Sequence, residues 1–550
     1  MSNIKSIGSI LILCLLGLYA TNPCAASDPG DTTSGKAPIY FYVSHHQEAV
    51  GSSYLGFPNF DRFKRNLRHE MELLDRYGVV SDQYFSDFIV SVVLYMRDSA
   101  KDPNAEDVFQ TFNQSRQNLG YHFHPTTWTA TDPEVLIRLE KIKDLPFDQA
   151  VMEYDKWERA YYDWSGCMGQ PGSGGGTCFC GSLDPNRLGG VRLMEQYFAK
   201  PVRAECLTIW NAPVGQVWRQ RYGDTVVGWI GNPHSYYTTG NAQYLWQSDW
   251  TFSPEPHVYV YRMMGLTFVK TFSNAWAERL APVSQIRQSL AALPRDMPHV
   301  FHIHLTIPGD DHDPLEDTLE YLTQSFIPAN PGSRFISSAD IPSLVAASPR
   351  QFTMADLDQG AIHLLQNWHG RPPAFVKYSG GAMSLASLFK ALQAAMQSYL
   401  ADTGLRTWPG SVTVADTIRP PLGLESDLPA DARLWQPISV ASMESAVLAL
   451  ATDNTVPYTV AIPVIGEDPG LPIQANAAEF LNGMATLFRH LRQGDTIGSM
   501  HITPGYIVPL SNIPTEAARQ TGQIKTLLDW TNDLQLWTLE PLRLKTAGLP

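Results

Sequence analysis

Residues 38–46 have the sequence Pro-Ile-Tyr-Phe-Tyr-Val-Ser-His-His, a β-branched and aromatic run that ends in two histidines. Such a run is typical of a buried strand. Residues 59–77 follow with apolar side chains at helical spacing, which predicts an amphipathic helix. Further strand-like stretches cover residues 78–85, 120–125, 225–230, 300–307 and 334–337, and residues 314–326 are helix-like. This alternation predicts a parallel α/β barrel over residues 37–348, with chemistry at the carboxyl ends of the strands.

Histidines gather where these strands are predicted to end. In a strand, residues i and i+2 point to the same face, so a pair with that spacing can reach one ion together. Adjacent histidines converge only if the strand has already ended. Neutral imidazole is a common metal ligand, and bound Zn²⁺ lowers the pKa of its water to about 7. The pattern predicts a divalent metal site, most simply zinc; the alternative is separate histidines hydrogen-bonded in a polar core. The six histidines are His45, His46, His122, His124, His302 and His304.

The order of these motifs resembles the glycoside hydrolase/deacetylase superfamily of irregular (β/α)7 barrels. Besides the first strand with its histidines, two segments carry the resemblance, Leu73–Val79 and Leu119–Pro125. In polysaccharide deacetylases of this superfamily, histidines after the third strand bind the metal, and a histidine on the last strand is the general acid. The resemblance implies that His122 and His124 are metal ligands. The gathering of histidines at the strand ends adds His45 and His46 as candidate ligands. It also implies that His302 or His304 is the general acid.

The first strand departs from the deacetylase pattern. Those enzymes carry paired Asp residues there, whereas this chain has Ser-His-His-Gln-Glu at residues 44–48. That stretch is similar to the His-Gln-containing first motif of glycosidases in the same superfamily, although Glu48 stands where those enzymes have Pro. Glu48 is itself a candidate catalytic carboxylate. A retaining glycosidase needs two carboxylates about 5–5.5 Å apart. The other carboxylates available are Asp82, Asp87, Asp310 and Asp311.

The amino-terminal residues predict export. An apolar run over residues 7–20 follows Lys5 and leads to small residues that end at Ala26. This run is too short to span a bilayer and is typical of a cleaved secretory signal, here residues 1–26. We therefore expect a secreted, periplasmic or cell-surface protein without an integral membrane segment once the signal is removed.

Four of the six cysteines remain after that cleavage, all within a glycine-rich insert at residues 163–206. In an exported protein, an even number of cysteines predicts two disulfides, with three pairings open. A zinc site with four cysteine ligands is the alternative, but the Cys-x-Cys spacing without a second close pair fits it poorly. The cysteines are Cys167, Cys178, Cys180 and Cys206.

The charge and the aromatic content of the chain indicate which class of ligand it binds. The formal net charge is −14, and no run of basic residues is present. Nucleic-acid binding works by neutralising phosphates, so we expect no nucleic-acid partner. Aromatic residues make up 11% of the chain, which suits stacking on the ring faces of a polysaccharide or cell-wall polymer. The alternative is an aromatic core.

The second half of the chain carries an internal repeat. The two copies are predicted as small, mainly helical modules over residues 350–415 and 435–550, with a linker at residues 416–434 and the tail completing the second module. They resemble pseudomurein-binding repeats, which implies a non-catalytic wall anchor; a duplicated helical domain without a ligand is the alternative. The candidate sugar-stacking side chains are Trp368, Tyr378, Trp408 and Tyr458.

Together these features predict a secreted, metal-dependent carbohydrate hydrolase, first of all a polysaccharide deacetylase, anchored by its repeats. The alternatives are a glycosidase of the same superfamily and a surface-binding protein whose barrel has lost its chemistry.

Overall fold

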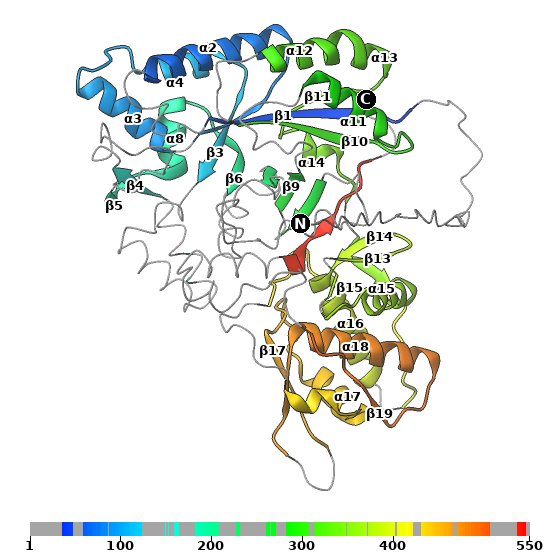
Figure 1. The fold of residues 1–550 in the computed structure, drawn as a ribbon. Helices are drawn as coiled ribbons and strands as arrows, with labels where there is room; N and C mark the ends of the chain where they lie inside the picture. The colour runs from blue at the N-terminus through cyan, green and yellow to red at the C-terminus, as the bar shows by residue number, and fades with distance from the viewer. Residues whose placement is uncertain are drawn as a thin grey trace, which may run out of the picture. The chain divides into compact units, whose positions relative to one another are not determined.

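The computed structural model of the chain describes residues 36–47, 59–85, 87–123, 149, 152, 159–163, 182–207, 227–230, 260–263, 266–270, 282–306, 313–347, 349–370, 372–373, 375–401, 404–421, 431–465, 470–505 and 536–545. They form a mixed α/β structure: a large sheet with helices comes first along the chain, and short hairpins with four longer helices follow (Figure 1). Among the helices of these ranges, none is both long and apolar enough to cross a membrane.

The large sheet is mainly parallel. In the described ranges, seven parallel strands follow the order β10-β1-β2-β3-β6-β7-β9, which confirms the predicted parallel sheet with intervening helices. β9 also approaches β10, although no ladder of hydrogen bonds joins these two strands in the described part of the chain. The sheet therefore curls toward closure, as a barrel does. The strands are β1 (Ile39–Gln47), β2 (Asp82–Phe85), β3 (Asn118–Phe123), β6 (Val202–Leu207), β7 (Val227–Ile230), β9 (Leu266–Lys270) and β10 (His299–Thr306).

Shorter strands add to this sheet. β11 (Arg334–Ile336) pairs in parallel with the first half of β1. β8 (Val260–Met263) pairs antiparallel with β9, and β20 (Glu540–Pro541) pairs antiparallel with β8. A separate hairpin joins β4 (Ala160–Asp163) and β5 (Ser182–Leu188).

Helices bury one face of the sheet. α2 forms because its apolar residues Phe60, Phe63 and Leu67 recur every three or four positions, and these side chains pack on Phe41 and Val43 of β1 in one apolar cluster. The helices of this part are α2 (Asn59–Arg76), α3 (Asp87–Asp98), α4 (Asp107–Gln114), α8 (Gly190–Phe198), α11 (Val283–Ala292), α12 (Asp313–Tyr321), α13 (Ile327–Ala329) and α14 (Ile341–Leu344); a π-helical turn, η3 (Leu322–Phe326), follows α12.

The loop after α2 determines where β2 starts. Gly78 has a φ of 70°, its N–H donates to the carbonyl of Asp75, and the Val79 N–H donates to the carbonyl of Leu74. This is a Schellman motif, which requires the left-handed conformation that glycine adopts readily. β2 therefore begins at Asp82, four residues later than the sequence pattern predicts.

The two faces of β1 have different surroundings. Phe41 and Val43 belong to the cluster under the helices, whereas Tyr40 and Tyr42 belong to a second cluster on the opposite face. Val300, Leu344 and other apolar residues complete that second cluster. We call the two sides of the sheet the helix face and the inner face. Because both faces of β1 are covered, the sequence of this strand is a continuous apolar run.

Two units with the same order of elements follow. Each has the order strand, helix, β-hairpin, helix, strand, and the first strand pairs with the last. The first unit is β12 (Gln351–Thr353), α15 (Met354–Gln366), β13 (Phe375–Tyr378), β14 (Gly381–Ser384), α16 (Leu385–Ala401) and β15 (Ser411–Thr413). The second is β16 (Ile438–Ser439), α17 (Val440–Ala449), β17 (Thr459–Ile462), β18 (Ile473–Asn476), α18 (Ala477–Gln493) and β19 (Ser499–Met500), with the 3₁₀ turn η4 (Ala432–Trp435) before it.

The two units share one core. α15 packs on α18 and α16 packs on α17, so each helix contacts its non-equivalent partner in the other unit. Leu388, Leu392 and Met396 hold the same positions in α16 as Phe480, Met484 and Phe488 hold in α18, and all six are buried.

The segments at the ends of the units are bound to neighbouring elements. Arg419, in the predicted linker, exchanges backbone hydrogen bonds with Asn454 and Val456 of the second unit. The tail, predicted to complete the second module, instead adds β20 to the large sheet, and the 3₁₀ turn η5 (Leu536–Thr538) before it contacts both α16 and β8.

Candidate functional site

The helix face of β1 carries a buried polar network centred on Glu70 of α2. The Glu70 carboxylate lies 2.6 Å from Nδ1 of His45 and accepts from Nε2 of Gln47 at 3.0 Å and Nε2 of Gln83 at 2.9 Å. All four side chains are buried. One carboxylate on α2 therefore binds the ends of β1 and β2 to the helix, and His45 lies in this network.

The inner face carries a second polar cluster, centred on Asp82. Its carboxylate accepts hydrogen bonds from the hydroxyl of Tyr42 at 2.5 Å, the hydroxyl of Ser338 at 2.8 Å and the amide of Asn118 at 3.0 Å. The hydroxyls of Tyr42 and Tyr84 are 2.9 Å apart. The cluster joins β1, β2, β3 and the turn after β11. We call it the inner-face cluster.

His302 joins the inner-face cluster from β10. Its Nε2 is 2.6 Å from Oγ of Ser44, and its ring lies 4.5 Å from the ring of Tyr42, tilted by 36°. His302 and Ser44 are both buried. His302, one of the two histidines predicted on the last strand, is therefore buried on the inner face of the sheet.

Burial controls the protonation of this cluster. It raises the pKa of the Asp82 carboxyl above its usual value, against the hydrogen bonds from Tyr42, Ser338 and Asn118, which lower it. Burial also raises the pKa of the Tyr42 hydroxyl well above its usual value, and the neighbouring Asp82 carboxylate acts in the same direction. Tyr42 therefore keeps its proton and acts as a donor to Asp82.

The strand register brings histidine positions next to this cluster. The Cα partner of Ser44 on β10 is His304, and the Cα partner of His46 on β2 is Tyr84. On β3, His122 follows Gly120, the partner of Tyr84, by two residues. The side chains of His46, His122 and His304 lie outside the described part of the structure, as do His124 and Glu48 entirely.

In the ranges that the structure describes, no three His, Cys, Asp or Glu side chains come together as a metal-binding group. His45 points to the helix face, where its Nδ1 meets Glu70, whereas Ser44 and His302 meet on the inner face. A shared site that includes both His45 and His302 is therefore not formed.

Other predicted residues also lie outside the described ranges. They include the signal segment, the carboxylates Asp310 and Asp311, and Cys167, Cys178 and Cys180. For Asp87 and Cys206, the backbone is described and the side chain is not.

The predicted sugar-stacking residues are half-buried and packed against the core of the two units. Trp408 stacks on Tyr399 with ring centroids 4.1 Å apart and lies edge-on to Phe488. By strand register, the position in β17 equivalent to Tyr378 in β13 is Ile462. The aromatic side chains therefore do not form a set repeated in both units.

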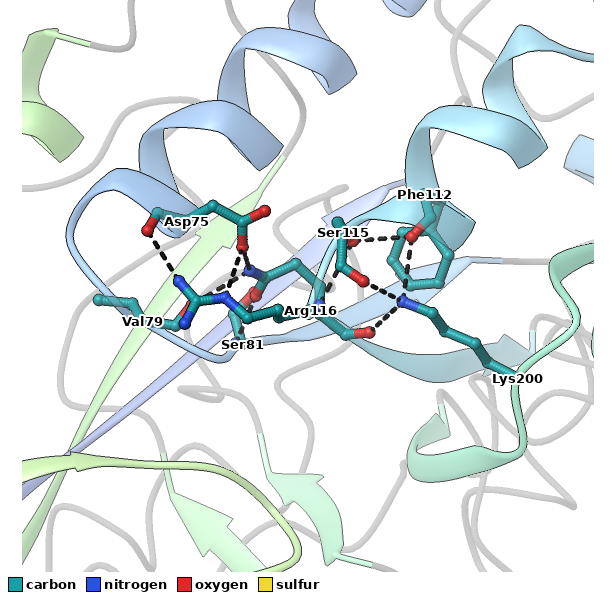
Figure 2. Close-up of polar contacts among 8 residues, drawn as sticks. Asp75, Val79, Ser81, Phe112, Ser115, Arg116 and Lys200 are labelled. Atoms are coloured by element: carbon teal, nitrogen blue, oxygen red, sulfur yellow. Dashed lines mark hydrogen bonds and ion pairs between the residues drawn. The ribbon is translucent and has the colours of Figure 1, made fainter.

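A further polar cluster lies at the opposite, amino end of the strands. Figure 2 shows Lys200, whose Nζ donates to the backbone carbonyls of Phe112, Ser115 and Gln117 at 2.8–3.0 Å. Gln117 in turn accepts from the N–H and hydroxyl of Ser81, just before β2. Chemistry in parallel α/β folds takes place at the carboxyl ends, so we assign this cluster to stability.

The sequence analysis missed several residues of these networks. Glu70 falls on the apolar stripe of α2, three residues after Leu67 and four before Leu74, and a carboxylate at such a position is a detectable signal of a buried polar contact. Tyr42 carries no such signal, because an aromatic residue in a buried strand is ordinary. Ser338 is distant in sequence from Asp82, so only the fold joins them.

Comparisons with known proteins show weak similarities between this chain and solved structures. No protein-family model matches the chain, and no curated protein matches it. The crystal structure of 4-alpha-glucanotransferase from Thermococcus litoralis is similar with a TM-score of 0.33 and 10% identity, over 60% of this chain and 44% of that chain. The GH57-type branching enzyme from the hyperthermophilic archaeon Pyrococcus horikoshii is similar with a TM-score of 0.32 and 8% identity, over 66% of this chain and 83% of that chain. Similarity at this level does not fix the activity.

Proposed function

We propose that the protein is a carbohydrate-active hydrolase whose reaction takes place at the carboxyl ends of β1, β2, β3 and β10. The inner-face cluster is the observation that carries the proposal. Interiors of parallel α/β barrels are filled mainly by bulky apolar side chains, whereas here Tyr42, Asp82 and His302 form a buried polar layer. Buried titratable groups with shifted pKa values gather at functional sites.

Within this class, we propose hydrolysis of acetyl groups on a polysaccharide. Water gives up one proton to a carboxylate base and adds its oxygen to the acyl carbon. The bond from that carbon to the sugar nitrogen or oxygen then breaks, and the leaving group takes up a proton. His304 is proposed as the acid that supplies this proton. His302 is assigned a supporting role, because it is buried and its Nε2 is engaged with Ser44.

A divalent metal, zinc first, is part of this proposal. His46, His122 and His124 would hold it, without His45. When bound, it would supply an activated water at neutral pH. Its test is metal analysis of the purified protein together with a His122→Ala/His124→Ala variant; equal metal content in both proteins would argue against these ligands.

The decisive experiment separates deacetylation from glycoside cleavage. We would incubate the purified full chain with an acetylated polysaccharide and measure both free acetate and new reducing ends. Acetate alone supports the proposal, and its release should fall at least tenfold in His304→Ala. The control is His501→Ala, an exposed histidine of the second unit.

Two other outcomes would replace the proposal. Reducing ends without acetate would indicate a glycosidase, in keeping with the His-Gln sequence at residues 46–47. Binding of the polysaccharide without either product would indicate a surface-binding protein.

We also propose that the protein is exported and that the two units bind the polysaccharide. Trp368, a half-buried tryptophan just after α15, is a candidate for stacking on a sugar ring. Trp368→Ala should weaken co-sedimentation with the polymer while acetate release from a short soluble substrate is retained. Amino-terminal sequencing of protein recovered from the culture medium or cell surface would test signal cleavage near residue 26.

A further inference from the structure

Tyr42 makes two kinds of contact within the inner-face cluster, one through its hydroxyl and one through its ring. Its hydroxyl lies between the Asp82 carboxylate, at 2.5 Å, and the Tyr84 hydroxyl, at 2.9 Å. Its ring packs on the ring of His302, whose Nε2 reaches Ser44. Tyr42 is fully buried and provides the contact between these two parts.

The proton count fixes the direction of the hydrogen bonds. A phenol carries a single proton, and Tyr42 donates its proton to Asp82. Its contact with Tyr84 must then be one in which Tyr84 donates and Tyr42 accepts. The charge on Asp82 therefore orients the hydroxyls of two tyrosines in sequence, from Tyr84 to Tyr42 to the carboxylate.

This chain of hydrogen bonds runs toward the carboxyl ends of the strands. Asp82 pairs with Ser44 of β1, which pairs on its other side with His304. Tyr84 pairs with His46, which lies two residues closer to the carboxyl end of β1. The ring of Tyr84 lies against Gly120, where an added Cβ would come within 2.6 Å of its Cδ1 atom.

We infer that Tyr42 is a positioning residue, which transmits the orienting effect of Asp82 to Tyr84 and holds the imidazole of His302 beneath the catalytic end of the sheet. For its effect on turnover, this inference rests on the proposed hydrolase function. Tyr42 itself does not contact substrate; it acts through Tyr84 and His302.

The test uses a matched pair of variants on one strand. Tyr42→Phe keeps an aromatic ring beside His302 but removes the hydroxyl through which Asp82 holds that ring in place. Tyr40→Phe makes the same change two residues earlier on the same face, at a residue that is also buried but outside the cluster. We expect kcat for acetate release to fall about tenfold in Tyr42→Phe, the effect of one lost hydrogen bond, with KM changed less than twofold. Tyr40→Phe should stay within twofold of the wild type in both.

A double-mutant cycle with Asp82→Asn shows whether Tyr42 acts through Asp82. If it does, Tyr42→Phe/Asp82→Asn should be no slower than Asp82→Asn alone. Additive losses in the double variant would overturn the inference, as would equal kcat values for Tyr42→Phe and Tyr40→Phe.

A readout independent of turnover separates this inference from the proposed function. In protein labelled with ¹⁵N at histidine, the imidazole resonances of His302, assigned with a His302→Gln variant, should move in Tyr42→Phe and not in Tyr40→Phe. If the wild type releases no product but these resonances move, the proposed function fails and the positioning role stands. If product is released and neither kcat nor the resonances change, the positioning role fails.

Discussion

Gly120 shows how much a single residue contributes to the inner-face cluster. It lies on β3 opposite Tyr84, and an added Cβ would meet the tyrosine ring at 2.6, 3.0 and 3.1 Å. The ring cannot move away freely, because the Tyr84 hydroxyl is bound to Tyr42. The absence of a side chain at position 120 therefore allows the tyrosine to reach across the neighbouring strand.

Gly120→Ala should displace Tyr84 and disturb the inner-face cluster. Overpacking of a buried site typically destabilises by about 1–3 kcal/mol, and we expect acetate release to fall with it. The measurements are urea unfolding and the activity assay. Gly498→Ala is the control, because nothing lies within 4 Å of its added Cβ. Equal stability and activity of the two variants would show that the ring shifts without consequence.

Asp431 provides a residue-level test at acid pH. Hydrogen bonds from Arg433 lower the pKa of the Asp431 carboxyl to about 2. A depressed folded-state pKa stabilises the fold above the unfolded value of about 3.9, and this contribution is lost as the pH falls from about 4 to about 2.

We expect Asp431→Asn to lower Tm at pH 6. The Tm difference between this variant and the wild type should become smaller as the pH approaches 2. Thermal unfolding between pH 6 and 2 measures this. Asp296→Asn, at an exposed position, should follow the wild type at every pH. A constant Tm difference between Asp431→Asn and the wild type across the range would contradict the assignment.

At the scale of elements, the two repeat units start their helices in the same way. Thr353, Ser384, Ser439 and Asn476 each accept a hydrogen bond from the backbone N–H three residues later. These are N-cap contacts, which satisfy donors that the first helical turn leaves open. The repeat is therefore maintained by capping chemistry as well as by its apolar face.

The caps should differ in strength with their burial. Asn476 also donates from Nδ2 to the carbonyl of Gly505 at 2.8 Å, and its capping partner Glu479 is buried. Asn476→Ala should lower the free energy of unfolding by more than the roughly 1 kcal/mol typical of a lost cap. Thr353→Ala, at an exposed cap of α15, is the comparison and should lose about 1 kcal/mol or less. Denaturant unfolding of both variants decides, and a larger loss for Thr353→Ala would be contrary to expectation.

At the scale of the whole molecule, the tail connects elements that lie far apart in the sequence. η5 contacts both α16 of the first unit and β8 of the large sheet, and β20 then pairs with β8. Trp537 in η5 is fully buried. The stability of the sheet edge and that of the repeat units should therefore depend on the same side chain.

Trp537→Ala should destabilise by about 3–5 kcal/mol, the usual effect of truncating a buried aromatic side chain. Hydrogen exchange should rise in α16 and in β8 together, because both contact the turn that carries Trp537. Trp408→Ala, a half-buried tryptophan that stacks on Tyr399, should raise exchange in the repeat units alone. An increase confined to one element in Trp537→Ala would show that the tail does not couple them.

The sequence by itself located the strands and helices whose apolar residues are regularly spaced. Periodicity located β1, α2, β10 and β11 to within a few residues, and the equal spacing of apolar residues in α16 and α18 indicated the duplication. Local patterns succeed here because burial of an apolar face repeats every two residues in a strand and every three to four in a helix. The start of β2 was missed because it depends on the left-handed turn at Gly78.

The tertiary structure decided which polar residues belong together. His45 and His302 both looked like members of one site, yet strand alternation and register place His45 with Glu70 on the helix face and His302 with Ser44 on the inner face. Ser338 reaches Asp82 from a turn more than 250 residues away. Such contacts depend on strand order and register, which arise from the packing of the whole sheet and leave no periodic trace in the chain.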